Sequence, residues 1–142
     1  MKPIVIACDH AGFELKEKLK AWFAQQSIKV EDVGTNSAEP VDYPVIVKKA
    51  VDLVRHYGTK GIFVCGSGVG ISIAANRYKG IRAVLTDKEV ITQLSRQHND
   101  ANVLCLGGRF ITFDEAKKLV QIFFETPFIG QHHQKRVQML DA

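Results

Sequence analysis

Short apolar runs rich in β-branched residues alternate along this chain with longer segments of helical period. Five runs predict β-strands, namely Pro3–Cys8, Ile28–Val33, Gly61–Cys65, Ile81–Leu85 and Asn102–Leu106. Four of them are almost wholly apolar, which is typical of strands buried on both faces of a parallel sheet. The remaining run, Ile28–Val33, alternates apolar with charged residues, so we expect it at an edge of the sheet.

The segments between these runs carry apolar residues at helical spacing. In the first segment Leu15, Leu19 and Phe23 fall on one face, as in a helix packed on a sheet. Thr112 and Glu115 have the spacing of a capping box at the start of a later helix. Further helices are expected over Pro44–Tyr57, Ile71–Tyr78, Lys88–Gln97 and, as a short tail, Gln131–Leu140.

Strand–helix alternation of this kind predicts an α/β fold: a doubly wound, Rossmann-like three-layer sandwich with a five-stranded parallel sheet. The predicted strand order is 2-1-3-4-5. Ligands bind such sheets beyond the carboxyl ends of the strands, where the winding direction reverses. This order puts the loops after the first and third strands side by side. No repeat, linker or low-complexity segment occurs, so we expect one domain over residues 1–142 with a C-terminal helical tail.

The composition is that of a soluble globular protein: 46% of the 142 residues are hydrophobic, 24% are charged, and the net charge is +4. No run of about 18 apolar residues could span a bilayer, and the first residues lack the features of a secretion signal. We therefore expect a cytoplasmic protein with no membrane partner. The lysines at 16, 18 and 20 alternate with Glu14 and Glu17, as on a solvated helix face. A nucleic-acid binder would instead show a basic stripe, so a small anionic substrate fits better than nucleic acid.

Three cysteines, Cys8, Cys65 and Cys105, are widely spaced, and no Cys-x-x-Cys pair or Cys/His ligand pattern is present. A metal site is therefore not expected, and in a reducing compartment all three should be free thiols. Cys8 and Cys105 lie inside apolar runs, which favours a buried structural role. Cys65 ends its strand directly before several glycines, so it is the candidate for chemistry.

Polar groups follow the first and third strands. Asp9 and His10 come after the first, although Asp9 could instead only cap the following helix. The loop GSGVG, residues 66–70, follows Cys65, and its N–H groups can converge with the next helix N-terminus into an anion cradle. The alternative is a tight turn without a ligand. The spacing matches neither the Gly-x-Gly-x-x-Gly fingerprint nor a Walker motif. A thiolate at Cys65 could serve as a general base or a nucleophile.

A dense polar stretch, SRQHNDAN at 95–102, separates the fourth helix from the fifth strand. His98 can exchange protons near neutral pH; the alternative is that His98 and Asn99 only cap the helix. Arg109, after the fifth strand, and Arg136, in the tail, are candidate phosphate clamps.

Four segments together resemble one family: CDHAG after the first strand, DYP at 42–44, CGSGVGISIAAN at 65–76 and LSRQHNDANVL at 94–104. They are similar to the ribose-5-phosphate isomerase B family, which includes the galactose-6-phosphate isomerase subunits, from about residue 2 to residue 137. The resemblance implies an aldose–ketose isomerase without metal or cofactor, which converts ribose 5-phosphate to ribulose 5-phosphate in the pentose phosphate pathway. It also implies a homodimer with pockets at the interface, or dimers paired into tetramers.

The resemblance assigns roles to residues. Cys65 would be the base that moves a proton between C1 and C2, and His98 would open the furanose ring and donate a proton. The sugar phosphate would be bound by Asp9, His10, Gly66, Ser67, Gly68, Val69, Gly70, Asn99, Arg109, His132 and Arg136. One branch of the family uses a Glu after the glycine loop in place of the cysteine, and here that position is Ile71. His132 stands where the family usually has Arg; because an imidazole loses its charge above a pH of about 6.5, we expect phosphate binding to weaken as pH rises.

Other functions stay open at this stage. The substrate could be a hexose 6-phosphate such as the allose or galactose form. The chain could also be a non-catalytic partner subunit that binds a sugar phosphate, which the retention of Cys65 and His98 disfavours. A nucleotide-binding regulator is disfavoured by the glycine spacing.

Overall fold

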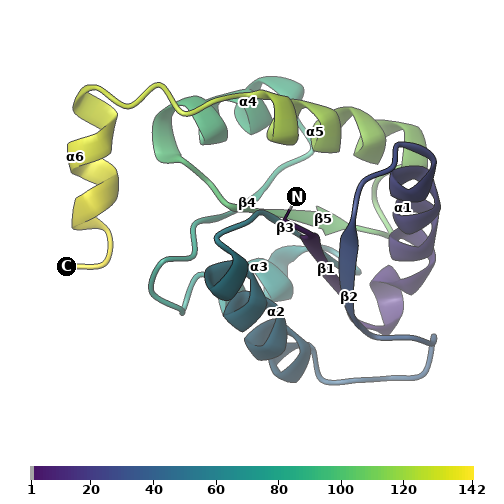
Figure 1. Cartoon of the computed structure of the whole chain (residues 1–142). Helices are drawn as coiled ribbons and strands as arrows, with labels where there is room; N and C mark the ends of the chain where they lie inside the picture. Colours follow the sequence, from purple (N-terminus) through teal and green to yellow (C-terminus); the bar gives the residue numbers. More distant parts are fainter. Residues whose placement is uncertain (1) are drawn as a thin grey trace.

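The structure, a computed structural model, describes residues 2–142 and alternates strands with helices (Figure 1). The strands are β1 (Ile4–Cys8), β2 (Val30–Gly34), β3 (Gly61–Cys65), β4 (Ala83–Leu85) and β5 (Val103–Gly107). The helices are α1 (Phe13–Gln25), α2 (Tyr43–Tyr57), α3 (Val69–Ala75), α4 (Glu89–Asn99), α5 (Phe113–Glu125) and α6 (His132–Met139), with a 3-10 turn, His10–Gly12, before α1.

The strands form one parallel sheet in the order β2-β1-β3-β5-β4. The predicted doubly wound α/β architecture is confirmed, but the predicted order 2-1-3-4-5 is wrong in its last two places. β5 is buried at every residue and pairs with β3 on one side and β4 on the other. β4 has only three residues, none of them buried. A short, partly exposed strand belongs at an edge, and a wholly apolar one belongs between two neighbours.

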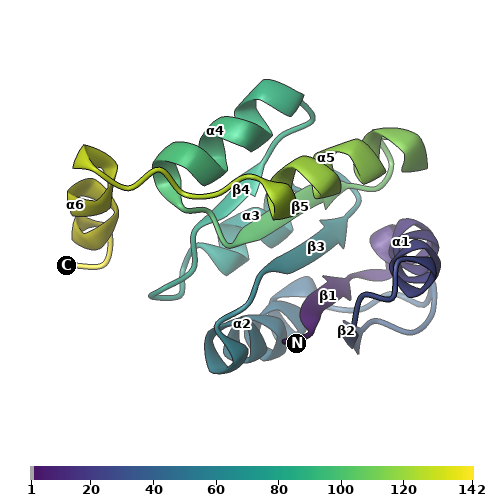
Figure 2. The same ribbon diagram turned by 45° about the horizontal axis from the view of Figure 1, so that its top comes forward.

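Right-handed crossovers convert this strand order into layers. The connections through α2 and α3 cross the sheet in one direction, and those through α1 and α4 cross it in the other. Accordingly α2 and α3 cover one face, while α1, α4 and α5 cover the opposite face (Figures 1 and 2). Each face has its own apolar core: Phe63 and Ile71 lie in the core under α2 and α3, and Leu19, Leu104 and Phe123 lie in the core on the side of α1 and α5.

The tail helix α6 stands apart from these layers, beside α4 (Figure 1). Two hydrogen bonds hold the segment around it, from Ile129 N–H to the Gln97 carbonyl (3.0 Å) and from Gly80 N–H to Asp141 Oδ2 (2.8 Å). None of the residues of α6 is buried. Across residues 2–142, every helix falls short of the length and apolar content that crossing a membrane requires.

The expectation of a solvated lysine face on α1 is wrong for Lys16. Lys18 is exposed, but the side chain of Lys16 has 0% exposure. Position 16 lies next to Leu15 and Leu19 on the helix surface that faces the sheet. A counter-charge comes from β2, where Asp32 Oδ1 lies 2.8 Å from Lys16 Nζ.

Candidate active site

A cavity of about 340 Å³ opens at the carboxyl ends of β1 and β3, beside the loop that follows β5. It lies where the winding direction of the sheet reverses, as the sequence predicts for a ligand site. The residues that line it are Asp9, His10, Ala11, Tyr43, Cys65, Gly66, Ser67, Gly70, Arg109 and Phe110.

Cys65 is the cysteine that lines this cavity. Its Sγ accepts a hydrogen bond from the Gly68 N–H at 3.1 Å, a contact that stabilises negative charge on sulfur. The other two cysteines are fully buried. Burial raises the pKa of Cys8 to about 11 and also raises the pKa of Cys105. Those two groups therefore remain thiols at neutral pH, and Cys65 is left as the candidate base.

The glycine loop approaches its neighbours too closely for side chains. Gly68 has φ +82°, and a Cβ there would lie 2.5 Å from Leu85 Cδ1. A Cβ on Gly70 would lie 2.9 Å from the ring of Tyr43. Of the loop N–H groups, that of Gly68 points to Cys65 and that of Val69 donates to Ser67 Oγ at 3.2 Å. The first turn of α3, which includes Gly70, has N–H groups without intrahelical acceptors.

Asp9 and His10 form the opposite wall. Asp9 Oδ1 accepts hydrogen bonds from the N–H groups of Ala11 (2.9 Å) and Gly12 (3.1 Å), so this carboxylate caps the turn and also lines the cavity. His10 Nδ1 accepts the Val41 N–H at 3.2 Å. Because Nδ1 is an acceptor, a neutral His10 carries its proton on Nε2 and can donate it to a ligand.

Arg109 brings a permanent positive charge to the cavity. Its N–H donates to the Gly66 carbonyl at 3.0 Å, which continues the pairing of β3 with β5 beyond the strand ends. Its guanidinium lies along the glycine loop, with Nη1 3.3 Å from the position of a Cβ on Gly66. Together the cavity groups can hold an anion, donate to a ligand oxygen and exchange a proton with a ligand carbon.

The remaining predicted site residues lie elsewhere. His98 and Asn99 end α4, which runs back to the amino edge of the sheet, and His132 and Arg136 lie on α6. His98 stacks on His133 with ring centroids 4.2 Å apart, and His132 lies 4.0 Å from the same ring. Loss of hydration, together with His132, His98 and Arg136, lowers the pKa of His133.

A larger hollow of about 540 Å³ lies at the amino edge, lined in part by Arg82, Arg96 and Asp100. Its arginines already have partners: Arg96 Nη1 lies 2.8 Å from Asp100 Oδ1, and Arg82 Nη2 lies 3.3 Å from Asp100 Oδ2. We therefore place the site at the carboxyl edge. Within residues 2–142, no three His, Cys, Asp or Glu side chains converge as metal ligands would.

Sequence reasoning missed Tyr43 and Phe110 as cavity residues. Tyr43 opens α2 and covers Gly70, and Phe110 is 76% exposed beside Arg109. Tyr43 belongs to the DYP segment that carries the family resemblance, and an aromatic residue before a helix-initiating proline was the available signal. An exposed Phe after a strand gave no comparable signal, because isolated surface apolar residues are common.

This fold and this site define a doubly wound α/β protein that handles a small anionic ligand at the switch point of its sheet. The sequence profile of the ribose/galactose isomerase family matches residues 4–140, and the chain belongs to that family. It is 43% identical to ribose-5-phosphate isomerase B of Escherichia coli, over 100% of this chain and 96% of that protein.

Solved structures agree with this family membership. A ribose 5-phosphate isomerase from Thermotoga maritima superposes with a TM-score of 0.95 at 48% identity, over 98% of this chain and 97% of that one. Ribose-5-phosphate isomerase B from Mycoplasma genitalium, solved with bound ribulose-5-phosphate, superposes with a TM-score of 0.90 at 39% identity, over 96% of this chain and 91% of that one.

Proposed function

We propose that this chain interconverts ribose 5-phosphate and ribulose 5-phosphate by proton transfer through an enediolate, in the pentose phosphate pathway and without metal or cofactor. The observation that carries the proposal is the Cys65 Sγ at the cavity wall, 3.1 Å from the Gly68 N–H. The names of the relatives support it, as does the ribulose-5-phosphate bound to the Mycoplasma genitalium protein.

In the proposed reaction, the Cys65 thiolate removes the proton from C2 of the open-chain aldose and returns it to C1. The negative charge of the enediolate then sits on oxygen, where N–H donors of the glycine loop stabilise it; one such donor is typically worth about 10²–10³ in rate. His10, as an Nε2–H donor, and the cation Arg109 hold substrate oxygens in the same cavity. Asp9 fixes the turn that carries His10.

The residues at the amino edge lead to a proposal about assembly. His98, Asn99, His132 and Arg136 cannot reach the cavity of their own chain, since the five residues of β5 alone separate the two edges by about 16 Å. We propose a homodimer in which these groups of a second copy face the cavity. There His98 opens the ring, and His132 and Arg136 bind the phosphate. Pairing of such dimers would give a tetramer.

The edge of the sheet at β4 supports this assembly. Exposed apolar side chains gather on the elements that flank it, namely Val69, Ile73, Leu85, Val90 and Ile91. Burial of apolar area drives the association of subunits, and a two-fold axis repeats the same patch on both copies. We further propose that residues 1–142 act as a single cytoplasmic isomerase domain with α6 as its helical tail.

The experiment that tests this function is a substrate panel of ribose 5-phosphate, allose 6-phosphate and galactose 6-phosphate, followed by NMR in deuterated water. We expect ribose 5-phosphate to react fastest and to yield ribulose 5-phosphate carrying deuterium at C1. Faster turnover of a hexose phosphate would replace the pentose assignment. Binding of all three without turnover would favour the non-catalytic subunit.

A further inference from the structure

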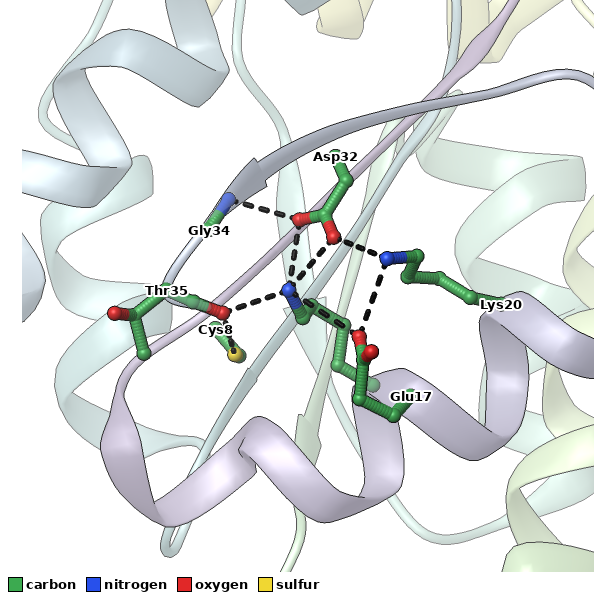
Figure 3. Close-up of polar contacts among 7 residues, drawn as sticks. Cys8, Glu17, Lys20, Asp32, Gly34 and Thr35 are labelled. Carbon is green, nitrogen blue, oxygen red and sulfur yellow. Dashed lines mark hydrogen bonds and ion pairs between the residues drawn. The ribbon is translucent and has the colours of Figure 1, made fainter. Parts of the chain in front are cut away.

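The buried Lys16 belongs to a polar cluster between α1, β2 and the segment that follows β2. Figure 3 labels its partners Glu17, Asp32 and Thr35. Its Nζ lies 2.8 Å from both carboxylate oxygens of Asp32 and 2.7 Å from the Thr35 carbonyl. Glu17 Oε2 lies 3.6 Å away, and the ring centroid of Phe13 lies at 5.5 Å. An ammonium group so fully removed from water persists only when partners satisfy its protons.

The same cluster fixes the chain where it leaves β2. Asp32 Oδ1 accepts the Gly34 N–H at 2.8 Å, and the Thr35 N–H donates to the Cys8 carbonyl at 2.7 Å. Burial alone would raise the pKa of Asp32, but hydrogen bonds from Lys16, Lys20 and Gly34 outweigh it and lower that pKa. Both members of the Lys16–Asp32 pair therefore hold backbone groups at the start of the loop formed by residues 35–42.

The far end of loop 35–42 reaches the active site. The Val41 N–H donates to His10 Nδ1 at 3.2 Å, and Tyr43 follows directly as the residue that covers Gly70. The loop has no helix or strand of its own. Its conformation therefore depends on anchors at its two ends. Lys16 Nζ holds its first carbonyl, that of Thr35, at 2.7 Å, and the Cys8 thiol adds a longer contact to the same oxygen at 3.7 Å.

We infer that Lys16 is a positioning residue for catalysis: paired with Asp32, it anchors loop 35–42 so that the Val41 N–H fixes the His10 tautomer that donates to substrate. This inference rests on the proposed function for its kinetic consequence, but its structural step stands apart from the identity of the sugar. Lys16 touches no cavity group itself and acts through the loop.

The test compares Lys16→Met with a matched control, Lys20→Met. Lys20 Nζ also binds Asp32, at 2.6 Å, but it does not contact Thr35 and is about one-third exposed (34%). In K16M we expect the Val41 amide to exchange hydrogen about tenfold faster or more, while the Leu104 amide of the core is unchanged relative to K20M. The ¹⁵N signals of His10 should shift toward a mixture of tautomers.

The kinetic effect follows from the same loss of the contact between the Val41 N–H and His10. With ribose 5-phosphate, kcat/KM of K16M should fall about 10- to 100-fold, whereas K20M should stay within about twofold of the parent protein. If K16M folds poorly because Asp32 loses its buried partner and keeps only Lys20, the double variant K16M/D32N removes the carboxylate charge and should still show fast Val41 exchange and low activity.

Equal Val41 exchange and equal His10 signals in K20M and in the Lys16 variants would overturn the inference. If the parent protein is inactive but the Val41 amide of K16M still exchanges hydrogen faster than that of K20M, the proposed function is overturned and the anchoring role stays in place. The two failures are therefore distinguishable.

Discussion

The three cysteines have different environments, and the environment decides which of them lines the cavity. Cys8 and Cys105 are fully buried and burial raises the pKa of each, whereas Cys65 lines the cavity and receives an amide hydrogen bond. The sequence indicated this choice, since Cys65 is the one at a strand end before glycines. It misplaced Lys16, because charge alternation along α1 did not reveal the buried partner Asp32 on another strand.

The first prediction concerns the base. Cys65→Ala should lower kcat for ribose 5-phosphate isomerisation by about 10³-fold or more, since it removes the proposed base while the Asp9 carboxylate stays bound to the N–H groups of Ala11 and Gly12. Binding of the sugar phosphate, measured by calorimetry, should stay within about threefold because the thiol is not a phosphate ligand. The matched control is Cys105→Ala, a buried thiol outside the cavity, which should retain activity. Equal loss of binding and turnover in C65A would contradict the assignment.

The second prediction concerns pH and the histidines on α6. Loss of hydration and the neighbouring cations lower the pKa of His133, so at neutral pH this ring is uncharged and Arg136 is the permanent cation of its group. As pH falls, His133 gains charge and phosphate binding tightens; as pH rises, that charge is lost. His133→Arg supplies a charge that does not titrate.

The ratio of KM of the parent protein to KM of H133R should therefore rise between about pH 5 and pH 7, by up to about tenfold. Ionisation of the substrate phosphate, with a pKa near 6, is common to both proteins and cancels in the ratio. Steady-state kinetics across this range measure it. A ratio that does not change with pH would show that His133 takes no part in phosphate binding.

At the scale of elements, the order of the last two strands shows how burial decides topology. Chain order suggested that β4 follows β3 across the sheet, yet β5 fills that place. The decisive signal was already in the residues, since Ile81–Leu85 contains the charged Arg82, whereas the fifth run is apolar throughout after Asn102. The handedness of the crossovers places α4 on the face of α1 and α5. His98 lies at the amino edge because α4 runs back from the end of β4 to the start of β5.

The third prediction tests the glycine loop. Gly68 and Gly80 have nearly the same φ, +82° and +81°, but a Cβ would lie 2.5 Å from Leu85 at Gly68 and no closer than 3.7 Å from Arg55 at Gly80. Alanine at either site should cost about 1 kcal/mol of backbone strain, measured by urea unfolding. Only Gly68→Ala should also displace the N–H that contacts Cys65 and reduce kcat, by about 10²-fold or more. Similar activity in G68A and G80A would contradict the role of this N–H.

At the scale of the whole molecule, the candidate site is divided between two edges of the sheet. Base, glycine loop and Arg109 meet at the carboxyl edge, and His98, Asn99, His132 and Arg136 gather at the amino edge and on α6. A second copy that packs against the exposed apolar side chains around β4 would unite both sets.

The fourth prediction follows from that division. Cys65→Ala and His98→Asn should each be nearly inactive as homodimers. A heterodimer of the two, purified with different affinity tags, contains one site with both substitutions and one site with neither. Its activity should therefore be about half that of the parent dimer. A heterodimer as inactive as its parents would show that His98 acts within its own chain.

The sequence by itself determined the α/β class, the end of the sheet where the cavity opens, the glycine loop and the cysteine that lines that cavity, because these depend on local periodicity and on residues that are neighbours along the chain. Only the tertiary structure decided that β5 lies between β3 and β4 in the sheet, that Lys16 is buried against Asp32, and that His98 is remote from Cys65 in one chain. Each of these depends on contacts between residues far apart in sequence, and such contacts are fixed by burial and packing rather than by any local pattern.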